Sequence, residues 1–196
     1  MKNRSKMLLS TVVVGALGLV VALGVFGLFS ATTQNAGNEI STGTVALSDN
    51  DSGQAMFSIN NAKPGDIWVR CIKVTYSGSV PADVHFYGKR TAGPLEPYLN
   101  MKVEQGTQAA PVFPGCNGFA PDAVGTLMDG PISQNPDTNG TYETGLPVNP
   151  AGQAVWNPGN TLVFRFTATL DASAPDSIQG QSTGVSGFFW EARNDQ

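Results

Sequence analysis

Two cysteines, Cys71 and Cys116, have the clearest chemistry of any residues in this chain. Both lie downstream of a hydrophobic N-terminal run, in the part of the chain that would be exported. In an oxidising compartment such a pair usually forms a disulfide. Closing this loop would stabilise the fold by roughly 4 kcal/mol, by lowering the entropy of the unfolded chain. The alternative is a pair of unrelated thiols, and we expect the disulfide.

Catalytic chemistry finds little support in the sequence. Acid–base or nucleophilic catalysis needs several titratable groups that converge, but the chain has one histidine, His85. A single histidine cannot supply a histidine-rich zinc site, and no HExxH, GxSxG or glycine-rich phosphate loop occurs. His85 lies between Val84 and Phe86, where we expect an outward-facing strand residue. We therefore predict no enzymatic activity, no catalytic residues and no cofactor.

Two acidic segments resemble fragments of calcium-binding loops. Asp49 and Asp51 place side-chain oxygens at alternate positions along the chain, and Asp137 and Asn139 do the same. Neither segment carries the downstream bidentate glutamate of a complete EF-hand. Asp, Asn and Gly are also the ordinary residues of tight turns. Turns are the favoured interpretation, and calcium binding is the alternative.

Three tryptophans could offer flat surfaces to a sugar ring: Trp68, Trp156 and Trp190. Such residues more often pack in the core or at the edges of a sandwich. Core packing is therefore favoured over a sugar platform.

The first thirty residues differ from the rest of the chain. Three basic residues open it: Lys2, Arg4 and Lys6. The uncharged run that follows, Met7 to Phe29, is long enough to span a bilayer as one helix. A cleaved signal peptide and a retained membrane anchor are therefore both open. Glycines within the run and small residues near its end favour cleavage between Gly24 and Ala31, which would leave everything after Ser30 outside the cytoplasm.

Charge separates the two parts of the chain. The whole sequence has 11 basic and 15 acidic residues. Only 8 of the basic residues lie beyond the N-terminal run, against all 15 acidic ones, so the remainder is near −7. An acidic surface argues against nucleic acid and anionic membranes as partners, and suits a soluble extracellular protein.

Apolar residues beyond the N-terminal run recur with the period of a β-strand. In residues 161–170 they share one face: Leu162, Phe164, Phe166, Ala168 and Leu170. Similar patterns predict further strands at 44–48, 55–59, 67–76, 84–86, 99–104 and 184–192. Turn sequences separate these runs at 63–66, 77–79 and 157–160. Short strands with turns between them predict an all-β, two-sheet antiparallel sandwich.

The pattern fails between residues 106 and 158. Seven prolines lie there: Pro111, Pro114, Pro121, Pro131, Pro136, Pro147 and Pro150. Proline removes a donor from the ladder, so central strands are not expected in this region. We predict long surface loops tied down by Cys116, with strand fragments only at 126–128 and 141–144.

Several motifs together resemble a known family. The N-terminal part carries Leu8-Leu9-Ser10, Phe29-Ser30 and Ser41-Thr42-Gly43-Thr44-Val45-Ala46-Leu47. A central turn reads Asn61-Ala62-Lys63-Pro64-Gly65-Asp66, and the C-terminal part carries Gln179-Gly180-Gln181-Ser182 and Trp190-Glu191-Ala192. These motifs resemble the SipW-dependent signal-peptide family, whose members include the biofilm-matrix fibre protein TasA and camelysin.

The resemblance implies a jelly-roll sandwich, export through a dedicated signal peptidase, and a destination at the cell surface or in a biofilm matrix. It also implies polymerisation, in which the freed N-terminal segment pairs with the sheet of the next subunit. The name camelysin carries a claim of metallopeptidase activity, and this sequence offers no ligand set for it. The resulting organisation is a signal peptide or membrane segment at 1–29, a flexible candidate donor strand at 30–43, and a sandwich at 44–196 with long loops at 106–158.

The leading functional hypothesis is a secreted structural protein that assembles with itself into fibres by β-strand addition. The residues of the assembly segment would be Ser30, Ala31, Thr32, Thr33, Gln34, Asn35, Ile40, Thr44, Val45 and Leu47. The first alternative is a module that binds carbohydrate or cell-wall polysaccharide through Trp156 and the long loops. The second alternative, disfavoured for want of metal ligands, is a camelysin-type metallopeptidase.

Overall fold

A computed structural model of the chain describes residues 43–134, 140–184 and 186–194, all within one compact unit, Thr42–Gln196. The predicted signal peptide, the segment 30–42 and the residues Asp137 and Asn139 lie outside the described residues. No helix within the described ranges is long and apolar enough to cross a membrane.

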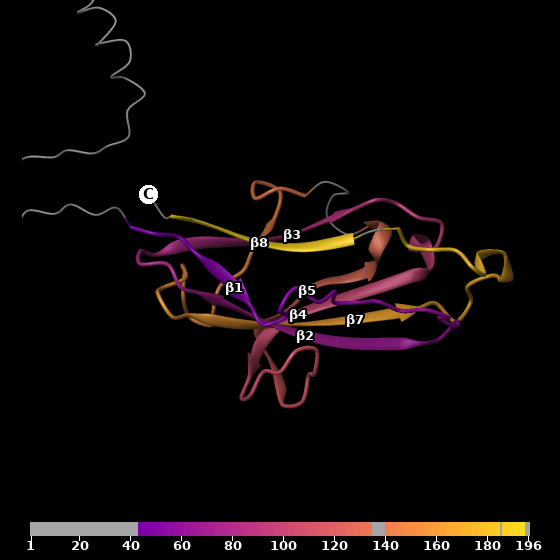
Figure 1. Cartoon of the computed structure of the whole chain (residues 1–196), viewed down its shortest axis with the longest axis horizontal. Coiled ribbons are helices and arrows are strands. Elements are labelled where there is room, and N and C mark those ends of the chain that lie inside the picture. The colour runs from indigo at the N-terminus through magenta and orange to yellow at the C-terminus, as the bar shows by residue number, and fades with distance from the viewer. Residues whose placement is uncertain (1–42, 135–139, 185, 195–196) are drawn as a thin grey trace, which may run out of the picture. The chain divides into compact units, whose positions relative to one another are not determined.

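The described residues form an all-β fold of two antiparallel sheets, which lie as two layers in Figure 1. The strands are β1 Leu47–Asp49, β2 Ile67–Tyr76, β3 Ala82–Arg90, β4 Leu99–Gln108, β5 Phe119–Pro131, β6 Leu146–Pro147, β7 Thr161–Leu170 and β8 Ser186–Asn194. One sheet has the order β1-β2-β7-β4-β5 and the other has the order β6-β3-β8. Helical structure in these residues is limited to short 3-10 turns at Glu96–Tyr98, Ile132–Gln134 and Asp176–Ile178. The predicted two-sheet sandwich is confirmed at this level.

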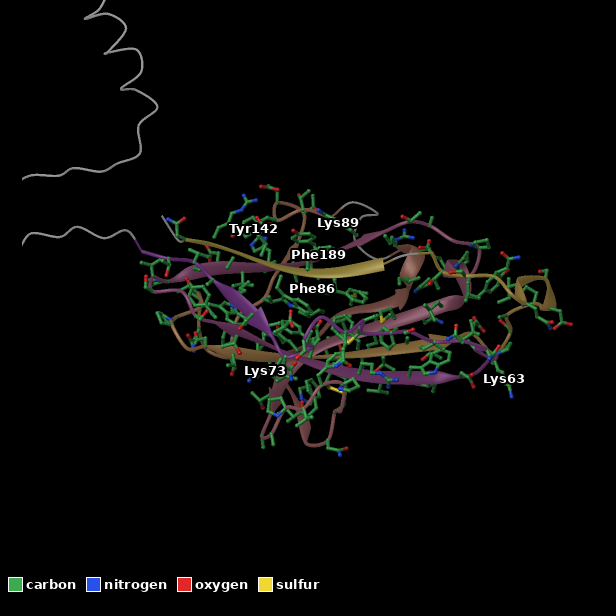
Figure 2. The ribbon with its side chains drawn as sticks, viewed as in Figure 1. Lys63, Lys73, Phe86, Lys89, Tyr142 and Phe189 are labelled. Carbon is green, nitrogen blue, oxygen red and sulfur yellow. A yellow bond between two sulfur atoms is a disulfide. The ribbon has the colours of Figure 1, made fainter. Side chains whose placement is uncertain are left out.

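The core lies between the two layers and is rich in aromatic rings. The predicted inward face of β7 is confirmed, since its five alternate apolar residues are all buried. Phe86 of β3 packs against Phe164 and Phe166 of β7 and against Phe188 and Trp190 of β8. Figure 2 shows Phe86 between the layers, whereas Tyr142, Lys89 and Phe189 lie on the solvent side of the three-stranded sheet.

Two expected strands differ from the structure. Residues 55–59 form no strand; Phe57 packs against the core, but Ala55 is exposed. The segment is irregular and has no neighbouring strand, and Met56 packs against the core beside Phe57. The strand expected at 44–48 is shifted to Leu47–Asp49, although the Thr44 and Ala46 carbonyls still accept hydrogen bonds from the turn that follows β2.

The proline-rich region contains more strand than expected. β5 runs for 13 residues through Pro121 and Pro131 and pairs with β4. Because β5 is the edge of its sheet, a missing proline N–H need not remove a ladder bond. Its pairing with β4 shifts register around Glu104. The fragment expected at 126–128 thus belongs to a longer strand, whereas 141–144 is a turn closed by the Thr144 N–H donating to the Thr141 carbonyl at 3.2 Å.

Candidate functional site: the edges of the two sheets

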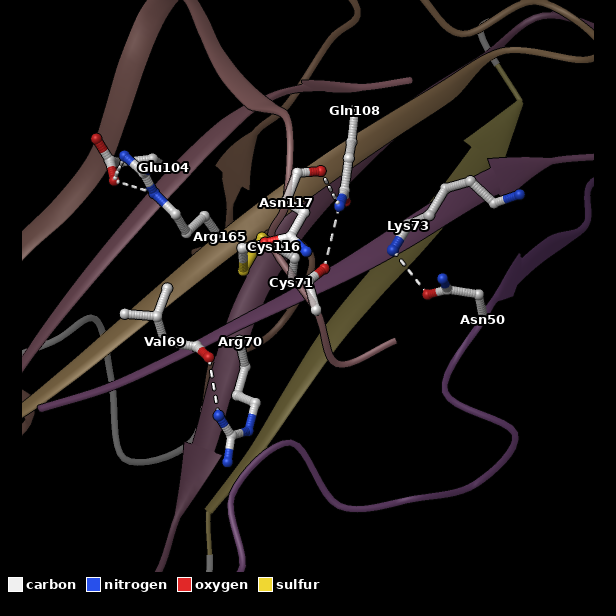
Figure 3. The surroundings of a disulfide bond; sticks show 11 residues. Asn50, Val69, Arg70, Cys71, Lys73, Glu104, Gln108, Cys116, Asn117 and Arg165 are labelled. Atoms are coloured by element: carbon white, nitrogen blue, oxygen red, sulfur yellow. Dashed lines mark hydrogen bonds and ion pairs between the residues drawn. A yellow bond between two sulfur atoms is a disulfide. The ribbon is translucent and has the colours of Figure 1, made fainter. Parts of the chain in front are cut away.

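The predicted disulfide is present between Cys71 and Cys116 (Figure 3). Cys71 lies on β2, on the face opposite the core, and is buried because the loop 109–118 covers it. The Gln108 amide donates to the Gly115 and Asn117 carbonyls at 3.1 and 2.9 Å, so the loop is also held by hydrogen bonds. The disulfide therefore fastens a long loop onto the outer side of β2.

The edge of β2 is covered along most of its length. β1 pairs with β2 only at Val74–Tyr76. Beyond β1, the Lys73 N–H donates to Asn50 Oδ1 at 2.8 Å and the Cys71 N–H donates to the Pro114 carbonyl at 3.0 Å. The Val69 carbonyl accepts from Arg70 Nη1 at 2.9 Å (Figure 3). Side chains and a loop thus occupy backbone groups that would otherwise pair with another strand.

The β5 edge is irregular. Asp122 Oδ1 accepts hydrogen bonds from the Val124 and Gly125 N–H groups, both at 3.0 Å, which bends the strand into a turn. Pro121 and Pro131 have no N–H to donate. A strand cannot pair continuously along such an edge.

The β6 edge is short. β6 has two residues, and one of them is Pro147. On the same side of β3, Ala82 exchanges two backbone hydrogen bonds with Trp156, at 3.0 and 2.8 Å. This side of β3 is therefore already occupied by the chain.

The β8 edge differs from the others. Ala82 and Val84 direct their backbone groups away from β8, to Trp156 and Val148. Along an antiparallel strand, successive residues direct their backbone N–H and C=O groups to opposite sides. The residues of β3 that alternate with Ala82 and Val84 therefore bond to β8, where their partners are Arg193, Glu191 and Phe189. The remaining residues of β8 point to the open side: Phe188, Trp190 and Ala192. Within the described part of the chain, no hydrogen bond reaches their backbone groups.

Side chains on the outer face fasten β8 to β3. The Tyr87 hydroxyl donates to Glu191 at 2.9 Å, across the two strands. Arg193 contacts Glu191 at 2.9 Å and Glu143 at 2.7 Å. A backbone N–H and the Arg193 guanidinium hold the pKa of Glu143 at about 2. β8 is thus held firmly on one side, whereas on the other side its backbone groups make no hydrogen bond to any described residue.

His85 lies on the outer face of β3, as expected, but is covered by a loop. Its ring stacks on Tyr142 with a centroid distance of 4.0 Å, and the Arg193 guanidinium lies 4.0 Å from the other face of the Tyr142 ring. His85 Nδ1 lies 2.6 Å from the Tyr142 carbonyl oxygen. The histidine belongs to a packed stack.

The acidic loop at the end of β1 has the geometry of tight turns. Asp49 Oδ1 accepts from the Asp51 N–H at 3.1 Å, and Asp51 Oδ1 accepts from the Gly53 N–H at 2.6 Å. Partial burial raises the pKa of Asp49, with the nearby Asp51 carboxylate adding to the rise. The carboxylates act as turn acceptors, the interpretation that the sequence favoured, and calcium binding at Asp49 and Asp51 stays the untested alternative.

The tryptophans pack against the core. Trp156 is fully buried and donates its Nε1–H to the Val148 carbonyl at 2.6 Å. Trp68 and Trp190 are partly buried against the core cluster. The hypothesis of a sugar platform built on Trp156 is therefore wrong, because a buried ring cannot stack on a polysaccharide.

The exposed edge of β8 was not found from the sequence. The sequence predicted a strand there but did not show which strands lie beside it. Its pattern of Phe188, Phe189 and Trp190 is consistent with either a central or an edge strand. The partners of a strand depend on topology, which alternation of residue types does not encode.

Comparison with known protein families gives a match to part of the chain. Residues 3–87 match a family described as camelysin metallo-endopeptidase. No curated protein shows significant similarity to the chain. Within residues 43–134, 140–184 and 186–194, no group of three or more His, Cys, Asp or Glu residues could hold a metal ion. The family match nevertheless overturns the expectation that the protein has no enzymatic activity, because the chain is similar from residue 3 to residue 87 to a family of metallo-endopeptidases.

Proposed function

We propose that the protein is exported and assembles with itself at the cell surface or in an extracellular matrix by β-strand addition. The observation that carries the proposal is the β8 edge, whose outward backbone groups make no hydrogen bond to any described residue, whereas the β2, β5 and β6 edges are occupied or irregular. An uncovered edge offers a row of backbone donors and acceptors to another strand. The fibre-forming, SipW-dependent relatives named in the resemblance would assemble in this manner.

The donor in this proposal is the segment from Ser30 to Ser41, released by a signal peptidase. The chain downstream of it is firmly attached to the sandwich. The Thr44 N–H donates to Ser79 Oγ at 2.8 Å, and the Thr44 carbonyl accepts from the Ser79 N–H at 2.8 Å. A segment tethered there can reach another molecule while its own domain stays folded.

The proposal includes a jelly-roll connectivity for the sandwich. Consecutive strands change sheets repeatedly, as from β2 to β3 and from β7 to β8. Such crossings between sheets are typical of jelly rolls. They leave β8, the last strand, at one end of the three-stranded sheet.

Deleting Ser30–Ser41 tests the proposal. The deletion should abolish assembly, and the sandwich should still melt cooperatively because its buried residues lie downstream. A matched control replaces the same residues with a Gly/Ser linker of equal length, which keeps the tether but lowers strand propensity. Electron microscopy and sedimentation of the three proteins report assembly. Fibres formed by the deletion variant would refute strand donation by this segment, and failure to fold would show that the segment is an internal strand.

Metallo-endopeptidase activity is a second candidate function, favoured by the family match. The described residues do not fit a zinc site, since His85 is stacked on Tyr142 and no cluster of metal-binding side chains accompanies it. Purified protein should be incubated with casein, with and without a chelator. Cleavage that follows the protein through purification and is lost with the chelator would support this function. Retention of a monomer by cell-wall polysaccharide would instead favour a binding module.

A further inference from the structure

We infer that Cys116 is a site of thiol exchange, at which a low-molecular-weight thiol opens the disulfide and forms a mixed disulfide on the loop 109–118. The inference concerns the outer face of the five-stranded sheet and does not depend on strand addition. It rests on the different surroundings of the two bonded sulfur atoms, since Cys71 belongs to a strand and Cys116 to a loop.

The two cysteines differ in their access to solvent. Cys71 is 2% exposed, because it lies in the middle of β2 and the loop 109–118 covers it. Cys116 is partly exposed, and the preceding Gly115 is exposed. A side chain added at Gly118 would meet no atom of the described residues within 4 Å, so the space beside this part of the loop is open. Because the sulfur that is attacked depends on access, a thiol in solution should react at Cys116.

The product of the exchange also fits better at Cys116. Cys71 is held in β2, which is paired with β7 on one side. Cys116 lies between two local turns, in which the Gly115 N–H donates to the Val112 carbonyl at 2.7 Å and the Phe119 N–H donates to the Cys116 carbonyl at 3.1 Å. A group attached to Cys71 would have to lie between β2 and the loop, whereas a group attached to Cys116 can extend into solvent.

Basic side chains beside Cys71 favour its departure. Arg165 of β7 is its partner in the ladder, and Lys73 follows two positions later on the same face of β2. Arg165 is paired with Glu104, at distances of 2.9 and 2.6 Å, whereas Lys73 makes no ion pair with any described residue. Positive charge stabilises a thiolate, so these surroundings make Cys71 the better leaving group.

The exchange balances in atoms and electrons. The thiolate of the small thiol attacks Cys116 Sγ, so that a new S–S bond forms there and the bond to Cys71 Sγ breaks. The electron pair of the broken bond stays on Cys71 Sγ, which leaves as a thiolate and takes a proton from water. One disulfide is replaced by another, so the step needs no oxidant.

Exchange frees the loop from its covalent attachment to β2. The loop is then held by hydrogen bonds, among them that from the Cys71 N–H to the Pro114 carbonyl at 3.0 Å. The amide of Cys71 should therefore exchange with solvent at least about tenfold faster in the adduct than in the oxidised protein. The amide of Lys73, on the same edge, is the matched control. It donates to Asn50 Oδ1 at 2.8 Å, outside the loop, and its exchange rate should not change.

Peptide mapping after a brief reaction tests the assignment of the sulfurs. The oxidised protein is mixed with glutathione, sampled over seconds to minutes and quenched with N-ethylmaleimide. Early samples should carry glutathione on Cys116 and maleimide on Cys71, in at least about tenfold excess over the reverse pattern. Early samples are needed because the Cys71 thiolate can later attack the adduct.

The same reaction in denaturing urea is the control for local sequence. When β2 and the loop are unfolded, both sulfurs are accessible, and the excess should fall below about threefold. A tenfold excess that persists in urea would show that the fold does not cause the preference, which overturns the inference.

Other results would also overturn it. Early glutathione on Cys71, or equal labelling of both cysteines, would contradict the assignment. So would a disulfide that stays intact under conditions in which glutathione opens cystine. An unchanged exchange rate of the Cys71 amide in the adduct would refute release of the loop. Strand addition is tested separately, by the Ser30–Ser41 deletion.

Discussion

Reduction of the Cys71–Cys116 disulfide offers a direct test of what stabilises the sandwich. The bond joins residues 45 positions apart and connects β2 to the loop 109–118. Reduction changes no other covalent bond. The unfolded chain regains the freedom of a loop of this length, whereas the folded chain keeps β2 paired with β7.

The magnitude follows from the loop length. The chain-entropy relation gives roughly 4 kcal/mol for a closed loop of this size. For a domain of this size, each kcal/mol shifts the melting temperature by about 2–4 °C. Reduction should therefore lower Tm by roughly 8–16 °C. The hydrogen bond from the Cys71 N–H to the Pro114 carbonyl should also weaken, since the loop is then held by hydrogen bonds alone.

Circular dichroism melts with and without a phosphine reductant measure this shift, and mass spectrometry confirms that both thiols are free. The matched control is the double variant Cys71→Ala, Cys116→Ala, whose Tm should be low and insensitive to the reductant. A shift below about 2 °C after complete reduction would refute the entropic account, because it would correspond to less than 1 kcal/mol.

Two further variants probe the packing of the sandwich and the outer face of β8. Trp156→Phe removes the buried hydrogen bond to the Val148 carbonyl and should lower the free energy of unfolding by about 1–3 kcal/mol in urea titrations; an unchanged midpoint would contradict the burial of this residue. Glu143→Gln tests the ion pair with Arg193: the pKa of Glu143 is lowered from 4.5 to about 2, so its contribution to stability is present above pH 4.5 and is lost as the pH falls toward 2. The Tm difference between wild type and variant should therefore shrink over that interval, and a difference independent of pH would refute the assignment.

Alternation of apolar residues with a period of two predicted the strands whose side chains pack in the core. It found β7 to the residue, and β2 as well, because alternate residues of both strands carry large apolar side chains that pack in the core. It failed where an apolar pattern has no neighbouring strand, at residues 55–59. It also missed most of β5, because prolines are compatible with an edge strand, and sequence does not reveal which strands are edges.

The candidate site was less predictable than the fold. The disulfide could be predicted because the sequence predicts export and its two cysteines allow a single pairing. The caps on the β2 edge could not, since Asn50 and Pro114 reach β2 from 23 and 43 positions away along the chain. Neither could the open side of β8, which depends on the order of strands in a sheet.

The asymmetry of the sandwich connects its fold with its proposed assembly. A five-stranded sheet faces a three-stranded one, so the smaller sheet leaves part of the shared core under β8 incompletely covered. The larger sheet ends at edges that side chains, a disulfide-bound loop and prolines make unsuitable for pairing. Edges protected in this way suppress indiscriminate aggregation. β8 has no such protection by hydrogen bonds, although it is firmly bonded to β3 along its ladder and its Glu191 and Arg193 side chains contact Tyr87 and Glu143, which agrees with the proposed addition of a strand at this edge.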